Sequence, residues 1–230
     1  MLFRSPVLNS MALEASTDLG LPALACAVQG SPLMVVGPGD AQRARVQQFI
    51  HEVYGEHYGA TIMHFAPCLV ALTDHDGHIV AAAGYRCAAW GPLYLEHYLD
   101  VPVEQALGAR PVQTRAHIVE VGHLAARRAG QGRRLSALLG MHLASLGYHW
   151  LVATLTVSLR ALFLRDGVVW QTLGAADPRR LGVQAVHWGR YYAFGPQVVA
   201  GHLGEMLNAT TCGRSEEHTS NSSHANISYA

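Results

Sequence analysis

Apolar residues recur along this chain in two different spacings. Runs rich in Val, Ile, Leu and Ala, several of them bounded by Gly, Pro or Asp, are typical of β-strands. Segments whose apolar residues recur every three or four positions, such as Val46, Phe49, Ile50 and Val53, are typical of amphipathic helices. We therefore expect strands within 33–36, 65–73, 78–85, 150–155, 168–173 and 198–200, a strand from His117 towards Arg127, and helices after Asp40 and over 101–107, 135–146 and 157–165.

Turn signals connect these elements. Asp40, after Pro38 and Gly39, is placed to cap the first helix, and Asp76-Gly77 between two apolar runs predicts a tight hairpin. The resulting order is β-α-ββ-α-β-α-β-α-β-β. It predicts an α/β fold with a mixed central sheet and helices on both faces.

Composition narrows the class of protein. The 230 residues are 50% apolar, which is enough for a full core, and sixteen basic residues balance sixteen acidic ones, so no broad charge indicates a nucleic-acid partner. No apolar run reaches the roughly 18 residues that a transmembrane helix needs. Four widely spaced cysteines without C-x-x-C fit a reducing compartment. We expect a cytoplasmic protein without a transmembrane segment.

The two ends of the chain differ from the middle. Residues 1–33 contain only a short, interrupted apolar patch, so we expect a weakly ordered lead-in followed by a single domain over 34–207. From Gly213 the composition turns to Ser, His, Asn, Glu and Thr. We expect 208–230 to be a disordered tail of artefactual origin, outside any functional site.

A glycine-containing pattern follows the central strand. Arg127, Gly130 and Gly132 spell R-x-x-G-x-G, and glycines let backbone N–H groups converge on an anion at a helix start. Arg133 and Arg134 are expected to open the helix, where cations are unfavourable unless an anion is bound. The pattern is similar to the pyrophosphate loop of the GNAT acyltransferase superfamily, which holds the diphosphate of coenzyme A. An ordinary turn with solvated arginines is the alternative.

Glu120 lies within the apolar central strand, where a carboxylate is costly unless it is paired or functional. A desolvated glutamate has the raised pKa that suits a general base. The alternative is an ion pair with an arginine, namely Arg86, Arg115 or Arg127. His123 is the second candidate. Strand alternation places it on the opposite face from Glu120, so only a bulge near Gly122 brings the two together.

Longer blocks occur in order between Gln48 and Gly201. They include F-x-P-C-L-V-A-L, A-A-A-G-Y-R-C-A, L-E-H-Y-L-D-x-P-V-E, I-V-E-V-G-H-L-A, S-L-R-A-L-F, A-A-D-P-R-R-L and W-G-R-Y-Y. In this range the chain resembles the thermostable hemolysin family, which is placed with the GNAT-like acyltransferases near the autoinducer synthases. The resemblance covers nearly all of the predicted domain.

The resemblance implies a GNAT-like fold and a reaction class. An enzyme of this kind moves an acyl group from acyl-CoA or acyl-carrier protein to an amine, with the thioester as co-substrate and no metal. By the same resemblance, the residues that hold the donor are Leu124, Arg127, Gly130, Gly132 and Arg133.

One departure from the GNAT pattern concerns the general acid. Such folds often place a tyrosine on the helix after the fifth strand, where this chain has Arg165, so Tyr191, with Tyr192 beside it, is the candidate substitute. The departure leaves open a catalytically inactive GNAT-like binding module. The family name also indicates an alternative function, that of a membrane-active haemolysin. No segment, however, combines a basic polar face with a wide apolar one, as such a function would need. Neither H-E-x-x-H nor G-x-S-x-G occurs, which disfavours metallohydrolases and serine hydrolases.

Overall fold

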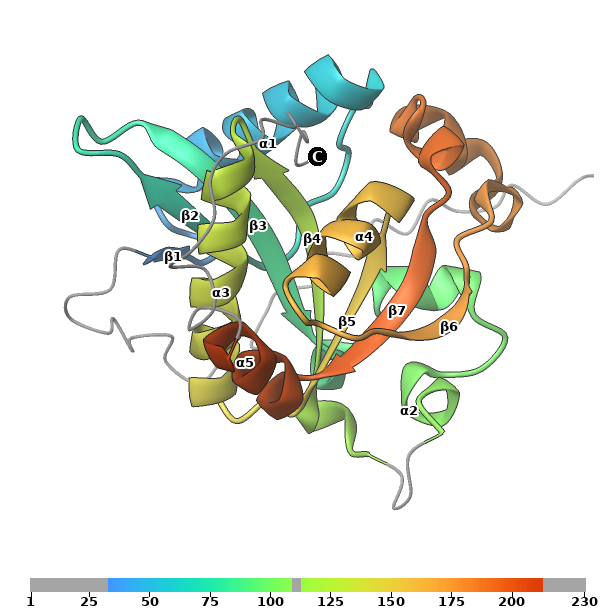
Figure 1. Cartoon of the computed structure of the whole chain (residues 1–230). Coiled ribbons are helices and arrows are strands. Elements are labelled where there is room, and N and C mark those ends of the chain that lie inside the picture. Colours follow the sequence, from blue (N-terminus) through green and yellow to red (C-terminus); the bar gives the residue numbers. More distant parts are fainter. Residues whose placement is uncertain (1–32, 109–112, 213–230) are drawn as a thin grey trace, which may run out of the picture.

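The computed structural model describes residues 33–108 and 113–212 (Figure 1). The predicted lead-in lies outside the described residues except for Leu33, and so do residues 213–230 of the predicted tail. Among the described residues, no helix has the length and apolar content needed to cross a bilayer.

The centre of the molecule is a seven-stranded mixed sheet with the order β1-β2-β3-β4-β5-β7-β6. Only β4 and β5 run parallel, and every other neighbouring pair is antiparallel. The strands are β1 (Leu33–Val36), β2 (Cys68–Thr73), β3 (Ile79–Cys87), β4 (Ile118–Ala126), β5 (Trp150–Leu155), β6 (Gln171–Ala175) and β7 (Gln197–His202).

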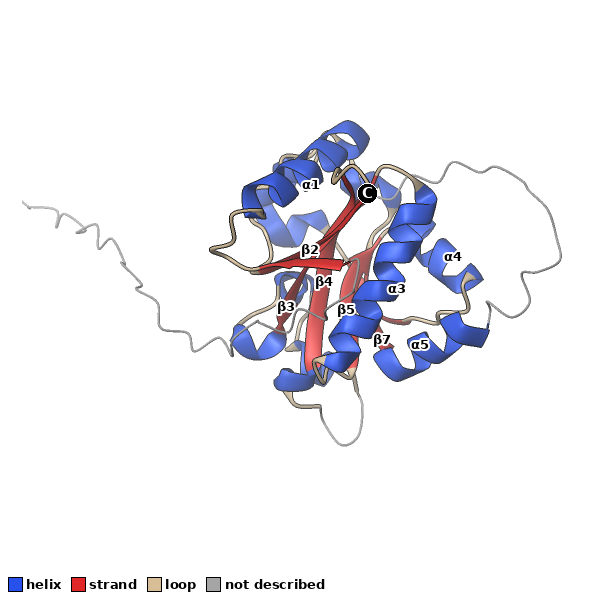
Figure 2. Cartoon of the chain, turned by 90° about the vertical axis from the view of Figure 1, so that its left-hand side faces the viewer, coloured by secondary structure: helices blue, strands red, loops and turns tan. Residues whose placement is uncertain are grey.

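Helices cover both faces of this sheet. They are α1 (Arg43–Tyr58), α2 (Val103–Ala106), α3 (Ala129–Ser145), α4 (Val157–Arg165) and α5 (Leu203–Cys212), with 3₁₀ helices η1 (Ala88–Trp90), η2 (Tyr94–Tyr98), η3 (Arg115–His117), η4 (Pro178–Trp188) and η5 (Tyr191–Phe194). Figure 2 shows α1 on one side of the sheet and α3, α4 and α5 on the other. Alternation along β2 explains the two cores, because Val70 and Leu72 pack with α3 while Leu69 and Ala71 pack with α1.

Several predicted boundaries were wrong. Asp40 does not cap α1: the N-cap is Gln42, and the Asp40 carboxylate accepts the Gln42 N–H (2.7 Å) in the preceding turn. Helix α3 begins at Ala129, six residues before its predicted start, so Gly130 and Gly132 lie in its first turn and not in a preceding loop. Strand β6 begins three residues late because Val168 still closes α4, donating its N–H to Phe163 O (2.9 Å).

Helix α5 was not predicted, and it corrects the boundary of the tail. It begins at Leu203 and continues through 208–212, which we had assigned to the tail. Leu203 and Met206 pack into the same core as α3, and Leu207 lies against Gly140 of α3. The spacing of these three apolar residues is that of one helix face, which gives the segment a folded partner.

The parallel pair β4 and β5 separates part-way along its length. Paired residues run from Ile118 with Trp150 to Val121 with Ala153, after which β4 continues to Ala126 and β5 to Leu155 without pairing to each other. The gap that results between the two strands lies in the middle of the sheet. It positions the site described next.

Candidate active site

A β-bulge marks the point where β4 leaves β5. Gly84 of β3 pairs with Gly122 and Ala82 pairs with Ala125, so β4 contains one more residue than β3 between these pairs. His123 has φ 55°, the positive value that non-glycine residues rarely adopt, and no other described non-glycine residue has one. The predicted bulge is therefore present, at the residue after Gly122. Because of this bulge, the side chains of Glu120 and His123 line the same hollow, although they are three positions apart on the strand.

This hollow, the polar chamber, has a volume of about 100 Å³. Its lining is Tyr54, His64, Phe65, Ala66, Arg86, Tyr94, Tyr98, Glu120, Val121, Gly122, His123, Thr154, Trp188 and Tyr191. Its aromatic members come from α1, η2, η4 and η5, except Phe65, which lies in the loop before β2.

Glu120 points into the polar chamber and also supports η2. Its two carboxylate oxygens accept the backbone N–H groups of Tyr94 and Leu95, both at 2.9 Å. Burial nevertheless raises the pKa of Glu120, because desolvation of the charge outweighs these two bonds and the nearby Arg86 cation. A carboxylate with a raised pKa that retains free lone pairs is suited to accept a proton.

The ion-pair alternative for Glu120 is not found among the described residues. Arg115 pairs with Glu96 (2.7 Å) and Glu104 (2.6 Å), and Arg127 pairs with residues of α1. Arg86 lies directly opposite Glu120 across β3 and β4 but forms no ion pair with it.

His123 is less suited to accept a proton. Its Nε2 donates to His64 O (3.1 Å), whereas its Nδ1 is buried without a partner and faces Gly84, where a Cβ would lie 3.2 Å away. Burial lowers the pKa of His123 to about 4. The ring is therefore neutral near pH 7 and only weakly basic. Of the two candidates on β4, the geometry favours Glu120 as the base.

Tyr191 is buried at the boundary of the polar chamber. Its hydroxyl donates to Thr154 O of β5 (3.1 Å), and burial raises the pKa of Tyr191 well above 10. Because the hydroxyl proton of Tyr191 is donated to this backbone carbonyl and is held tightly, Tyr191 is poorly suited to act as a general acid. Arg165 is exposed at the end of α4, and Tyr192 shares a hydrogen bond with Tyr98 (2.7 Å).

A second hollow, the apolar chamber, lies on the α3 side of the sheet and has a volume of about 110 Å³. Apolar residues of β4, α3, β5, α4, α5 and the segment before β6 dominate its lining, among them Leu124, Leu139, Leu151, Leu155, Leu159, Phe163, Val168, Trp170, Leu203, Met206 and Leu207. The two chambers share Tyr54, Val121, Gly122, His123, Thr154 and Tyr191 as lining residues. They therefore meet at the bulge, beside the gap between β4 and β5.

The start of α3 lies next to this gap. Arg128 is the N-cap, and no acidic residue occupies the first turn. The Arg128 carbonyl accepts the N–H groups of Gln131 (3.0 Å) and Gly132 (3.4 Å), so the N–H groups left for an anion are those ahead of Gln131. The two predicted anion-binding arginines are engaged elsewhere. Arg127 pairs with Glu52 (2.8 Å) and Glu56 (3.4 Å), and Arg133 pairs with Asp166. The arrangement offers an anion the backbone and the exposed Arg128 and Arg134.

Residues 36–207 match the sequence profile of the family described as "Thermostable hemolysin". The chain belongs to the thermostable hemolysin family. A search of curated proteins finds no match.

Solved structures show where this family's fold belongs. The chain is similar to TofI in a complex with an inhibitor and MTA (TM-score 0.54, 17% identity, covering 78% of this chain and 96% of TofI). It is also similar to BjaI, a CoA-dependent acyl-homoserine lactone synthase with SAM and isopentyl-CoA (TM-score 0.54, 12% identity, covering 78% of this chain and 87% of BjaI). A third similar structure is FeeM, an N-acyl amino acid synthase from uncultured soil microbes (TM-score 0.51, 13% identity, covering 77% of this chain and 99% of FeeM). The predicted GNAT-like fold is confirmed.

Sequence reasoning did not assign the polar chamber's other charged group. Arg86 entered only as a possible ion-pair partner, although it interrupts the apolar run of β3 as Glu120 interrupts β4. That shared signal was available in the sequence. The aromatic lining was not predicted, because Tyr94 and Trp188 lie 94 residues apart in the sequence. They meet only in the folded chain, where the indole N–H donates to the Tyr94 hydroxyl (2.9 Å).

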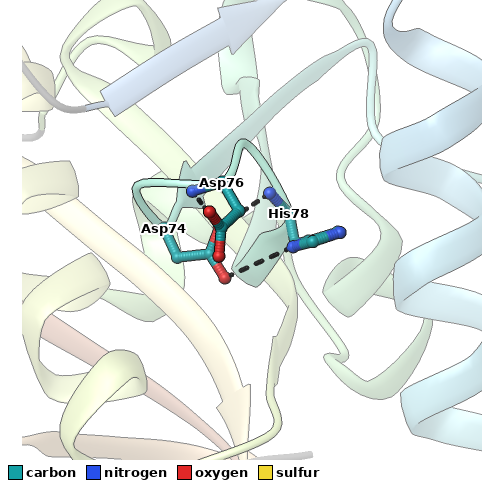
Figure 3. A group of neighbouring side chains, drawn as sticks. All are labelled: Asp74, Asp76 and His78. Carbon is teal, nitrogen blue, oxygen red and sulfur yellow. Dashed lines mark hydrogen bonds and ion pairs between the residues drawn. The ribbon is translucent and has the colours of Figure 1, made fainter.

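Asp74, Asp76 and His78 form a separate group of polar side chains in the β2–β3 turn (Figure 3). All three are exposed, and the Asp74 carboxylate accepts the N–H groups of Asp76 (3.0 Å) and His78 (2.8 Å). These bonds explain the grouping as part of the tight turn.

Proposed function

We propose that this protein is an acyltransferase that moves an acyl group from a coenzyme A or acyl-carrier-protein thioester to an amine. The observation that carries the proposal is the junction of two unlike chambers at the β4 bulge. One chamber suits an acyl chain, the other contains a carboxylate with a raised pKa, and the gap between β4 and β5 gives both access to one carbonyl.

The donor's phosphate group is assigned to the start of α3. The N–H groups ahead of Gln131 and the helix dipole attract an anion there, and the exposed Arg128 adds a cation. Both donor types carry a phosphate on a pantetheine arm, so either is compatible with the site. Nothing lies within 4 Å of the position of a Cβ at Gly130, so a phosphate has room there, and the buried Leu124 lines the chamber that receives the acyl chain.

The chemical step begins with the acceptor amine in the polar chamber. Its nitrogen attacks the thioester carbonyl, a C–N bond forms and the C–S bond breaks. Of the two protons that an ammonium group loses, Glu120 takes one and passes it to solvent, and the departing sulfur takes the other. The products are an amide and a free thiol. The structural relatives named above support this class through their shared fold.

Thermal-shift titration and a transfer assay test the proposal together. We expect acyl-CoA or acyl-carrier protein to raise the melting temperature and a mixed amine pool to release free thiol. Stabilisation by the donor without transfer to any amine indicates a binding module. Leakage of liposomes by the purified protein without a donor indicates a membrane-active toxin. No stabilisation by any donor contradicts the assignment of the α3 site.

A further inference from the structure

The polar chamber contains two opposite charges that the protein does not pair with each other. Arg86 and Glu120 face each other from β3 and β4, and no ion pair joins them. Among the described residues, they are the only ones of types Arg, Lys, Asp or Glu that line this chamber. Partly buried charges without a counter-ion are costly, so such a pair is suited to a ligand that brings both charges.

Each of these groups has capacity left for a ligand. Arg86 uses Nη1 to donate to Pro92 O (3.2 Å), and the described residues offer no other acceptor to its five N–H groups. The carboxylate of Glu120 accepts one N–H on each oxygen, which leaves one lone pair on each.

The aromatic wall is the part of the lining formed by Tyr94, Tyr98, Trp188 and Tyr191, whose polar groups bond within the protein. The Trp188 N–H bonds to the Tyr94 hydroxyl (2.9 Å), Tyr98 bonds to Tyr192 (2.7 Å) and Tyr191 bonds to Thr154 O (3.1 Å). What these rings present to the chamber is therefore mainly apolar. His123 adds no charge near pH 7 because burial lowers its pKa to about 4.

We propose that the acceptor is an α-amino acid, whose carboxylate binds Arg86 while its amine lies at Glu120 and its side chain packs on the aromatic wall. This inference rests on the acyltransferase function proposed above and names its substrate class. The product is an N-acyl amino acid: the amine nitrogen gains the acyl carbon, the thioester loses its sulfur as a thiol, and the amino acid carboxylate stays unchanged. Arg86 then acts as a specificity-determining residue.

The test compares each amino acid with the amine that lacks its carboxylate. Leucine against 3-methylbutylamine and phenylalanine against 2-phenylethylamine give pairs with the same side chain, and a pool of the remaining amino acids extends the search. The purified full chain is assayed with acyl-CoA and acyl-carrier protein. Arg86→Gln keeps a donor for Pro92 O but removes the charge. Arg179→Gln removes an exposed arginine outside the chamber and is the matched control.

We expect kcat/KM for amino acids to exceed that for the paired amines by roughly 30-fold or more, the selectivity of a desolvated charge pair. Arg86→Gln should reduce this ratio towards one, mainly through KM, whereas Arg179→Gln should keep it. Equal use of amines and amino acids, or an unchanged ratio in Arg86→Gln, overturns the inference but leaves the acyltransferase function in place. Failure of transfer to every acceptor overturns both, and donor stabilisation then separates a binding module from a protein without the donor site.

Discussion

The two chambers that meet at the β4 bulge differ in what they offer a ligand. The polar chamber has one carboxylate and one guanidinium that do not pair with each other, and a wall of aromatic rings. The apolar chamber is lined mainly by apolar side chains of β4, β5, α3, α4 and α5, and the charged residues in its lining, Arg133 and Asp166, pair with each other. A charged pair selects by chemical group, because mismatched charges are costly when desolvated. An apolar cavity selects by size, since each methylene contributes about 0.8 kcal/mol wherever it is buried. Changes in the two chambers should therefore alter different kinetic properties.

The largest effect is expected in the polar chamber. Glu120→Gln removes the proton acceptor, so turnover should fall by roughly 10²–10⁴, the usual contribution of general acid–base catalysis. The same change replaces one of two N–H acceptors with an amide NH₂, which should cost about 1–3 kcal/mol of folding stability. Turnover, donor affinity and melting temperature measured on one preparation separate the two effects.

Glu96→Gln is the matched control for this experiment. Glu96 also supports the η2 segment, accepting the N–H groups of Leu93 (2.7 Å) and Val103 (2.9 Å), but it lies outside the polar chamber. It should lower the melting temperature and leave the turnover of the folded fraction nearly unchanged. If Glu120→Gln behaves in the same way, the catalytic assignment is wrong.

In the apolar chamber we expect a change of substrate length. Ala137 of α3 lines this chamber, and Ala137→Leu fills part of it. Use of long-chain donors should fall by roughly 10-fold or more relative to short-chain donors, as expected for a pocket that has lost room for a few methylenes. Competition assays with donors of several lengths measure this ratio.

Ala144→Leu, on the same helix but outside the chamber, makes the same chemical change and should not alter chain-length preference. A parallel loss of activity with all donors in Ala137→Leu would indicate damage to the fold and not a smaller chamber.

A smaller effect is expected at the start of α3. Gly130→Glu places a negative charge beside the proposed phosphate position, and a Cβ at Gly130 meets nothing within 4 Å. Donor affinity should fall roughly 3- to 10-fold, the range of helix-terminus electrostatics. A carboxylate in the first turn also favours the helix, so stability should not fall. Titration of Gly130→Glu and Gly130→Gln with the donor separates the effect of charge from the effect of side-chain size. Equal donor affinity in the two variants would show that the phosphate binds elsewhere.

The last effect concerns the pH dependence of stability and not activity. Because the folded-state pKa of His123 is lowered to about 4 from 6.5, the unfolded chain binds the proton first as pH falls. The contribution of neutral His123 to the free energy of unfolding is complete above pH 6.5 and decreases as pH falls from 6.5 to 4. Urea unfolding at several pH values should show a steeper loss for the natural chain than for His123→Gln. Identical slopes would show that His123 titrates normally.

Much of the fold follows from local sequence, and less of the site does. The runs at Leu33–Val36 and Trp150–Leu155 match β1 and β5, because buried strands need only continuous apolar side chains. Glu120 was identifiable as a carboxylate within such a run. The bulge at His123 was stated only as a condition, since register depends on the partner strand.

What could not be predicted depends on contacts between distant segments. Nothing local to Arg127 indicates that Glu52 of α1 binds it, and nothing local to Arg133 indicates Asp166. Helix α5 has the apolar spacing of a helix. The Ser- and Asn-rich sequence that follows it led us to predict that the tail begins at 208, before the helix ends. Long-range pairing decided these points in the folded chain.

The central claim is that one substrate carbonyl lies at the β4 bulge with its acyl chain in the apolar chamber. A crystal structure of the protein with a non-hydrolysable acyl-CoA analogue measures this directly. We expect the chain among Leu139, Leu155 and Leu159, the carbonyl near Val121 to His123, and the diphosphate on the first turn of α3. An acyl chain lying against the aromatic wall, or outside the gap between β4 and β5, would contradict the claim.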